Sequence, residues 1–439
     1  MIILDTAEQP QTQGPNITRP ISRPSVTYDA RRHSAVRTEE YVFSQLIPYL
    51  GNKRKLLPLI AQAVDLTGVR EGIFADLFAG SGVVARWAKQ HGYRVLANDW
   101  EPYAEDINGC HIGLNAPPPG AQRFVDILND NALAIDGYFA QNLCPADDEH
   151  PDPKRERCFF TRFNGRRIDA IREQIADWEA SGDIDIDTRR YLMAPLLYAT
   201  SYVSNTSGVF KAYHHGWGGA TGTALYRILS EIRLVPPVLI DNGHQNIVTR
   251  ADAVDVALGW ADIDTSTIGV VPGGNLPLGP LDIAYLDPPY NQHPYGSNYH
   301  VLSTVSLWDK PAVGPMTHGS KSAIRKDWRT ERRSAYNHTN AALPELLRLI
   351  DALPCRWVLL SYSTDGNIPV ETLLDALARR GDTTLVTRRY KRYRVSTQRM
   401  SPRPHNIEFV AVLDKYAKPN AKKSAEHFRI LSQLASDLA

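Results

Sequence analysis

The feature that most limits the fold is a strand, a glycine turn, a helix and a second strand in direct succession. "GIFADLFAGSGVVARWAKQHG" (72–92) passes from an apolar strand pattern into a turn of small residues and then into a helical pattern. "YRVLAND" (93–99) supplies the second strand. A strand that reaches its neighbour through a helix is half of a doubly wound α/β sheet, so we expect an open, mostly parallel sheet.

The remaining elements are spread unevenly along the chain. The alternation stops after residue 110, and later strands are predicted at 246–251, 281–286 and 356–362. Helical patterns are expected near residues 53–64, 165–180, 186–203, 221–233, 340–352 and 369–380. A last pair of strands predicts a C-terminal antiparallel hairpin, at about 384–394 and 406–413.

These patterns predict three parts. Residues 1–40 are rich in Pro, Thr, Gln and Arg without an apolar period, which is typical of a flexible arm. Residues 41–110 and 246–439 are expected to form one α/β domain. Residues 111–245 are expected to form a largely helical insertion between the second and third strands of its sheet.

Composition excludes several classes of protein. The chain has 439 residues and a net charge of +1, as an ordinary globular protein does. Its four cysteines lack CxxC spacing, so we expect no metal site, no disulfide framework and a cytoplasmic location. No apolar run approaches the roughly 20 residues of a membrane span. The N-terminus lacks a signal-peptide pattern, so we expect neither export nor membrane association.

The near-zero net charge hides a basic C-terminal part. Residues 311–439 hold 22 Lys and Arg against 12 Asp and Glu, whereas residues 111–245 hold 13 against 17. The densest stretch, "RRYKRYRVSTQR" (388–399), interleaves positive charges with two tyrosines. A solvated edge hairpin would explain it, and so would a surface that contacts nucleic-acid phosphates. In the second case the contacts would come from Arg389, Lys391, Arg392 and Arg394.

The glycine turn "DLFAGSG" (76–82) follows a strand and opens a helix. Small residues at this place let a ligand approach the backbone N–H groups, although a tight turn alone also favours glycine. Asp99 ends the next strand, where an acidic side chain can accept hydrogen bonds from both ribose hydroxyls. Because the turn lacks GxGxxG spacing and no GK[ST] follows, a nucleoside without phosphates fits better than NAD or ATP.

"DPPY" (287–290) follows the strand predicted at 281–286, at the same edge of the sheet as the glycine turn. The two prolines would make a rigid exit turn in any protein. Rigidity also fixes the Asp287 carboxylate and the Pro288 carbonyl as paired acceptors for the two hydrogens of an exocyclic amino group. Such a pair would direct the nitrogen lone pair at an electrophile, and Tyr290 would stack on a base flipped out of the duplex.

The order of these motifs resembles the Dam-like, D12-class family of S-adenosylmethionine-dependent DNA adenine-N6 methyltransferases. That family has a YxGxK-type segment, DxFxGxG, an acidic second strand, a target-recognition insertion and DPPY, and all five occur in this order over residues 47 to about 413. The resemblance implies a Rossmann-like class I methyltransferase fold and S-adenosylmethionine as cofactor. It also implies double-stranded DNA as substrate and a restriction endonuclease, where one exists, as a separate polypeptide.

Functional residues carry over position by position. The resemblance assigns catalysis to Asp287, Pro288, Pro289 and Tyr290. Asp252 corresponds to an acid near the cofactor adenine, although a helix N-cap is an equal alternative. The other cofactor-binding positions implied are Tyr49, Gly51, Lys53, Asp76, Phe78, Gly80, Ser81, Gly82 and Asp99. Leu77 stands where many members have proline.

Two further segments resemble parts of the family that contact DNA. "NTSGVF" (205–210) matches an NxxGxF segment through Asn205 and Phe210. "NQHPYGSNYH" (291–300) offers Asn291, Tyr295, Tyr299 and His300, which we expect to close over the flipped base. We expect His300 to have a structural or phosphate-binding role, because a methylated amine loses its proton readily to water.

Three alternatives remain open. The same chemistry could act on cytosine N4 or on an exocyclic amine in RNA, but the early YxGxK-type segment and the long insertion favour the DNA adenine family. A catalytically silent DNA-binding subunit would be expected to have a broken DPPY or glycine turn, and both are intact. The recognition sequence and the oligomeric state cannot be deduced from the chain.

Overall fold

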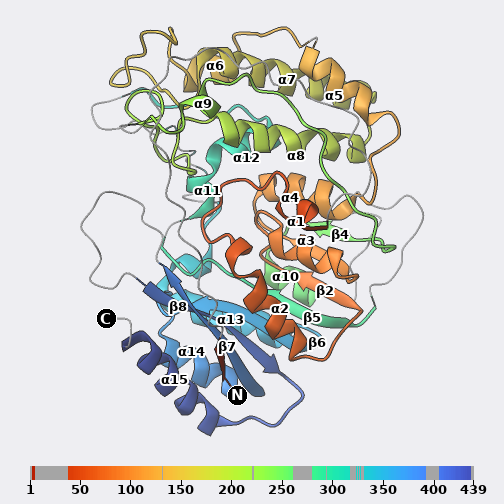
Figure 1. Cartoon of the computed structure of the whole chain (residues 1–439), viewed down its shortest axis with the longest axis vertical. Coiled ribbons are helices and arrows are strands. Elements are labelled where there is room, and N and C mark those ends of the chain that lie inside the picture. Colours follow the sequence, from red (N-terminus) through yellow and green to blue (C-terminus); the bar gives the residue numbers. More distant parts are fainter. Residues whose placement is uncertain are drawn as a thin grey trace.

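The computed structural model describes most of the chain, and Figure 1 shows its layout. The described residues are 2–4, 38–130, 132–219, 222–260, 279–292, 294–316, 323, 325, 327, 331–391 and 405–436. A sheet flanked by helices forms one half of the molecule, and a group of helices forms the other (Figure 1). None of the described helices is both long and apolar enough to cross a membrane.

The described strands form one sheet in the order β1-β7-β8-β6-β5-β2-β3-β4. Neighbours pair in parallel except at β8, which runs antiparallel to both β6 and β7. The strands are β1 (Ile2–Leu4), β2 (Ile73–Asp76), β3 (Arg94–Asn98), β4 (Ile247–Thr249), β5 (Leu281–Leu286), β6 (Cys355–Ser363), β7 (Asp382–Lys391) and β8 (His405–Asp414). The predicted α/β class with a mostly parallel sheet is confirmed.

Apolar helix faces cover both sides of the sheet. On one side, apolar residues of α10 (Ala253–Leu258), α13 (Thr339–Ala352), α14 (Val370–Ala378) and α15 (Ala421–Ser436) share a core with the strands. On the other side the core includes α1 (Thr38–Phe43), α2 (Leu57–Asp65) and α3 (Val83–Gln90). Because both faces are covered, the central strands are buried along their length, and polar chemistry is confined to their ends.

A separate core holds the helical half together. Its elements are α4 (Pro102–Asn108), η2 (Gly109–Gly113), α5 (Ala121–Asp130), α6 (Tyr138–Leu143), α7 (Arg162–Ser181), α8 (Ile186–Val203), α11 (Tyr295–Asn298) and α12 (His300–Leu307). The last two helices follow β5 in sequence, so this core joins the segment after DPPY to residues 111–245. The segment that follows DPPY is therefore packed on both halves of the molecule.

The helix expected at 221–233 is the clearest error in the predicted elements. Only α9 (Leu225–Ile228) forms there. The side chain of Asn164 in α7 donates to the carbonyls of Ile228 and Ser230, at 3.3 and 2.9 Å, and accepts from the amide of Ile232 at 3.0 Å. One buried asparagine thus satisfies backbone groups that a helix would have paired internally, and the chain runs on extended.

Candidate active site

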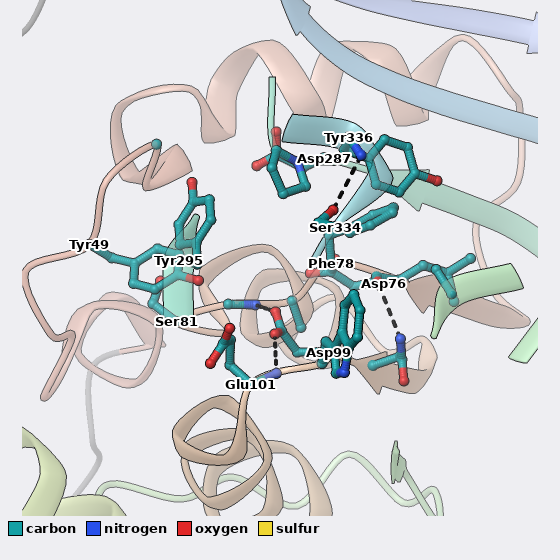
Figure 2. A pocket seen from close by; sticks show the side chains of 18 of the residues that line it. Tyr49, Asp76, Phe78, Ser81, Asp99, Glu101, Asp287, Tyr295, Ser334 and Tyr336 are labelled. Carbon is teal, nitrogen blue, oxygen red and sulfur yellow. Dashed lines mark hydrogen bonds between the residues drawn. The ribbon is translucent and has the colours of Figure 1, made fainter. Parts of the chain in front are cut away.

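A cavity of about 270 Å³ lies at the carboxyl ends of β2, β3 and β5. Figure 2 shows the side chains that line it. The lining comes from distant parts of the chain: 49–53, 76–84, 98–101, 251–253, 285–296 and 332–337. The predicted meeting of the glycine turn and DPPY at one edge of the sheet is therefore observed, because parallel strands end on the same side.

Gly80 lets an aromatic ring lie directly against the glycine turn. Its φ is +51°, and a Cβ atom built on it would lie 2.7 Å from Cε1 of Tyr49. Asp99 anchors the turn, since its Oδ2 accepts from the Gly80 amide at 2.7 Å and its Oδ1 from the Glu101 amide at 2.8 Å. One carboxylate therefore fixes two bends of the cavity wall (Figure 2).

The end of the turn is fixed by further contacts. Gly82 precedes α3 with φ +79°, and a Cβ there would lie 2.3 Å from Oδ1 of Asn108. The neighbouring Ser81 hydroxyl accepts from Asn52 Nδ2 at 3.0 Å. This bond ties the glycine turn to the segment before η1 (Lys53–Lys55), which forms another wall of the cavity.

Asp76 brings an unpaired acidic oxygen to the cavity. Its side chain is buried, and Oδ1 has no hydrogen-bond partner in the described structure. Burial, together with the charge of Asp287, raises the pKa of Asp76 well above its usual range. A buried carboxyl without a partner is costly unless a ligand satisfies it, so this oxygen marks a place for a donor or a cation.

Asp287 follows β5 and forms a buried ion pair. Its Oδ1 lies 2.8 Å from Nζ of Lys53, which also donates to the Gly51 carbonyl at 3.0 Å. Burial raises the pKa of the Asp287 carboxyl, and the positive charge of Lys53 opposes that rise. The ammonium lies 5.2 Å from the centre of the Tyr290 ring, so the first and last residues of DPPY share one cation.

Aromatic side chains stand on two sides of the cavity (Figure 2). Tyr49 and Tyr295 have ring centres 5.1 Å apart, and the Tyr295 hydroxyl donates to the Leu50 carbonyl at 2.9 Å. Phe78 meets Tyr336 edge to face at 5.3 Å. Such walls bind flat apolar groups, such as the base of a nucleoside, while leaving the acidic groups to fix its orientation.

Sequence reasoning missed the segment that crosses the cavity at 331–337. Arg332 forms an ion pair with Glu101, and the Asn337 side chain donates to the Asn291 carbonyl at 2.7 Å. Ser334 caps the short turn that presents Tyr336. Its polar sequence, "ERRSAYN", has no apolar period and no motif, so only its contacts in the folded chain reveal it.

Most predicted cofactor and catalytic positions meet at the cavity. It is lined by Tyr49, Gly51, Lys53, Asp76, Phe78, Gly80, Ser81, Asp99, Asp252, Asp287 and Pro289, and also by Tyr295, which was expected to contact DNA. Asp252 also caps α10, accepting from the Val254 amide at 2.8 Å, so both of its interpretations agree with the structure. Gly82, Pro288 and Tyr290 are adjacent in sequence to lining residues, and the Tyr290 ring packs edge to face on Tyr362 at 5.6 Å.

Four side chains that were expected to contact DNA are buried instead: Asn205, Phe210, Tyr299 and His300. Asn205 donates to the Cys158 carbonyl at 3.0 Å and accepts from the Gly218 amide at 3.1 Å. Tyr299 accepts from the Leu50 amide at 2.7 Å. Groups that complete internal hydrogen bonds and cores have no surface to offer to DNA, which corrects the expectation for Asn205, Phe210 and Tyr299. The burial of His300 agrees with a structural role, one of the two that were expected for it.

The predicted basic contacts are only partly described. Arg389 in β7 is exposed, and Lys391 ends that strand. Arg392 and Arg394 lie outside the described residues. Asn291 is partly buried at the cavity, where its carbonyl accepts from Asn337.

His300 provides a stability test of its buried position. A carbonyl can only accept, so the ring Nε2 donates to Phe210 O at 2.9 Å. Burial lowers the pKa of His300 to about 4, below the value of about 6.5 expected in the unfolded chain. Its contribution to stability is therefore present above about pH 6.5 and lost as the pH falls toward 4.

We expect His300→Gln, which keeps a donor but cannot titrate, to be less sensitive to acid than the wild type. Between pH 7.5 and 4.5 the wild type should lose about 2–3 kcal/mol more unfolding free energy than the variant. Urea unfolding at both pH values measures this difference, and the other histidines are common to both proteins. Equal acid sensitivity would contradict the buried, neutral assignment.

The sheet and its cavity place the chain in the class of α/β proteins that bind a ligand at the carboxyl ends of parallel strands. The sequence model of the D12 class N6 adenine-specific DNA methyltransferases matches residues 49–259 and 276–349. The chain belongs to this family and is an adenine-specific DNA methyltransferase.

Individual relatives agree with this assignment. The type II methyltransferase M.NlaIII of Neisseria lactamica is 29% identical over 84% of the chain and 99% of its own length. The modification methylase LlaI of Lactococcus lactis subsp. lactis is 29% identical over 84% of the chain but 54% of its own length. The modification methylase StsI of Streptococcus sanguinis is 28% identical over 75% of the chain and 46% of its own length. No solved structure matches the chain.

Proposed function

We propose that the protein transfers the methyl group of S-adenosylmethionine to the N6 amine of an adenine flipped out of double-stranded DNA. One observation carries this proposal. The Asp287 carboxylate faces the same cavity as the glycine turn and Asp99, so a methyl donor and an acceptor amine can meet there. Family membership supports adenine in DNA as the substrate.

The residues of the cavity fit S-adenosylmethionine. When bound, it supplies an electrophilic methyl group on a sulfonium sulfur. Asp99 would accept from the ribose hydroxyls with the lone pairs that its backbone bonds leave free. The unpaired Oδ1 of Asp76 would meet a positively charged part of the cofactor, and binding would return the raised pKa of this carboxyl toward its usual range.

The base would bind at the DPPY side of the cavity. The Asp287 carboxylate and the Pro288 carbonyl would accept the two amino hydrogens and direct the nitrogen lone pair at the methyl group. Methyl transfer would form a nitrogen–carbon bond as the sulfur–carbon bond breaks, leaving the sulfur as a neutral thioether, and the extra proton on nitrogen would leave to water. Tyr290 would stack on the base once the adenine has left the duplex.

The remaining assignments follow from this function. We propose that residues 111–245 form the target-recognition domain and that residues 41–110 and 246–439 form the catalytic domain, whose sheet also includes residues 2–4 of the expected arm, paired with β7. Arg389 and Lys391 lie where β7 ends and would contact DNA phosphates.

The names of the relatives support a role in a restriction-modification system with a separate endonuclease. The DNA substrate and four buried cysteines that form no disulfide support action in the cytoplasm.

Product analysis tests the proposal directly. Duplex DNA incubated with the protein and S-adenosylmethionine should yield N6-methyladenine after digestion to nucleosides, as measured by mass spectrometry. N4-methylcytosine as the sole product, or methylation of RNA alone, would overturn the assignment of the substrate. No methylated product and no cofactor affinity, with or without DNA, would instead favour a silent DNA-binding subunit.

A further inference from the structure

Lys53 occupies an unusual place for a lysine. Its side chain is 2% exposed, and its Nζ lies 2.8 Å from Asp287 Oδ1 and 3.0 Å from the Gly51 carbonyl oxygen that accepts from it. A buried ammonium is costly unless nearby negative charge compensates it. Because Nζ is directed at the acid of DPPY, its role is tied to that acid.

A second carboxylate interacts electrostatically with Lys53 and Asp287. Glu408 in β8 is 5% exposed, and Asn406 Nδ2 donates to its Oε1 at 2.9 Å and to the Ser363 hydroxyl at 2.7 Å. Its Oε2 has no hydrogen-bond partner in the described structure. Burial raises the pKa of Glu408, whereas the charge of Lys53 opposes the rise and that of Asp287 adds to it. The three charged groups therefore form one electrostatic cluster.

The surroundings of Asp287 otherwise disfavour its negative charge. The titratable side chains that interact with it are Lys53, Asp76, Tyr285, Tyr290, Tyr295 and Glu408. Among these described groups Lys53 is the cation, and the others are acids or phenols. Without Lys53, the partly buried Asp287, whose side chain is 16% exposed, would tend to take up a proton. A protonated carboxyl presents a donor where the amine needs an acceptor.

We propose that Lys53 is a positioning residue that keeps Asp287 ionised and oriented as an acceptor, and that the negative charge of the buried Glu408 opposes this effect. This inference rests on the proposed methyl transfer. It assigns to Lys53 a role different from contact with the cofactor. The balance of the two opposing charges sets the pH at which Asp287 becomes an effective acceptor.

Single-turnover methylation rates measured against pH test this arrangement, with DNA and cofactor saturating. Lys53→Met should move the acid limb of the profile up by about one to three pH units, the usual effect of a neighbouring opposite charge. Lys53→Arg keeps the charge and should keep the wild-type midpoint even where its rate is lower. Glu408→Gln keeps the acceptor for Asn406 but loses a negative charge, so its midpoint should move down.

Opposite shifts in the two variants are a result that a merely structural role would not produce. If Lys53→Met is too slow to measure, Glu408→Gln alone tests the proposal. An acid-limb midpoint that equals or exceeds the wild-type midpoint in Glu408→Gln overturns it. Calorimetric titration with S-adenosylmethionine checks the variants, and a large loss of affinity in Lys53→Arg would indicate a cofactor contact instead. Absence of methylation by the wild type would refute the proposed function itself, whereas an active wild type with coincident profiles refutes only this inference.

Discussion

Asp287→Ala is expected to lower the rate of methyl transfer by about 10²–10³-fold. In the proposed mechanism the carboxylate is the charged acceptor at the reacting amine, and removing one preorganised polar group from an active site typically costs a factor of this size in rate. Asp287→Asn, which keeps the size of the side chain, should fall by a similar factor because its amide loses the charge. The measurement is the single-turnover rate at saturating DNA and cofactor.

Two controls separate chemistry from folding. Asp287→Ala leaves Lys53 buried without its partner, which can cost several kcal/mol of stability, so thermal unfolding must accompany the rates. Asp65→Asn removes the same charge from an exposed ion pair with Arg70 and should leave the rate unchanged. A folded Asp287→Asn protein with near-normal activity would show that DPPY only turns the chain.

Gly80→Ala is expected to lower the affinity for S-adenosylmethionine by about 10–100-fold. A left-handed backbone costs an L-residue roughly 1–2 kcal/mol. In addition the new Cβ would lie 2.7 Å from the Tyr49 ring, which is stacked on Tyr299 at 4.8 Å and has little room to retreat. The ring would be pushed into the space proposed for the cofactor. Isothermal titration calorimetry measures the change.

Gly68→Ala is the matched control for this substitution. Gly68 has φ +72°, and a Cβ there would meet nothing within 4 Å. The control therefore carries the backbone strain without the contact, and we expect lower thermal stability with unchanged cofactor affinity. Equal affinity in Gly80→Ala and the wild type would show that the turn does not approach the ligand.

The sheet and the cavity could be predicted because they rest on local signals. The apolar runs predicted the bounds of β5 and β6 almost correctly. Parallel strands end on one side of the sheet, and this brings Asp76, Asp99 and Asp287 together at the cavity. Arg332 pairs with Glu101 across 231 positions of the chain, and no local pattern announces such a contact.

The incorrectly predicted residues share one cause. Their side chains form hydrogen bonds with backbone atoms that are distant in the sequence. Asn205 and Tyr299 look like surface polar residues in sequence, but each completes internal hydrogen bonds. Whether a polar group faces solvent or a buried partner depends on packing, which periodicity does not report.

The Asn164 contacts have a consequence for how such a protein can change over time. Because this buried side chain serves the backbone at 228, 230 and 232, the path of that segment does not depend on the side chains it displays. Tyr226 and Leu229 are 73% and 52% exposed there, so substituting them should cost little stability. If residues 111–245 recognise the DNA sequence, substitutions of the exposed side chains on this segment can change the specificity with little loss of stability.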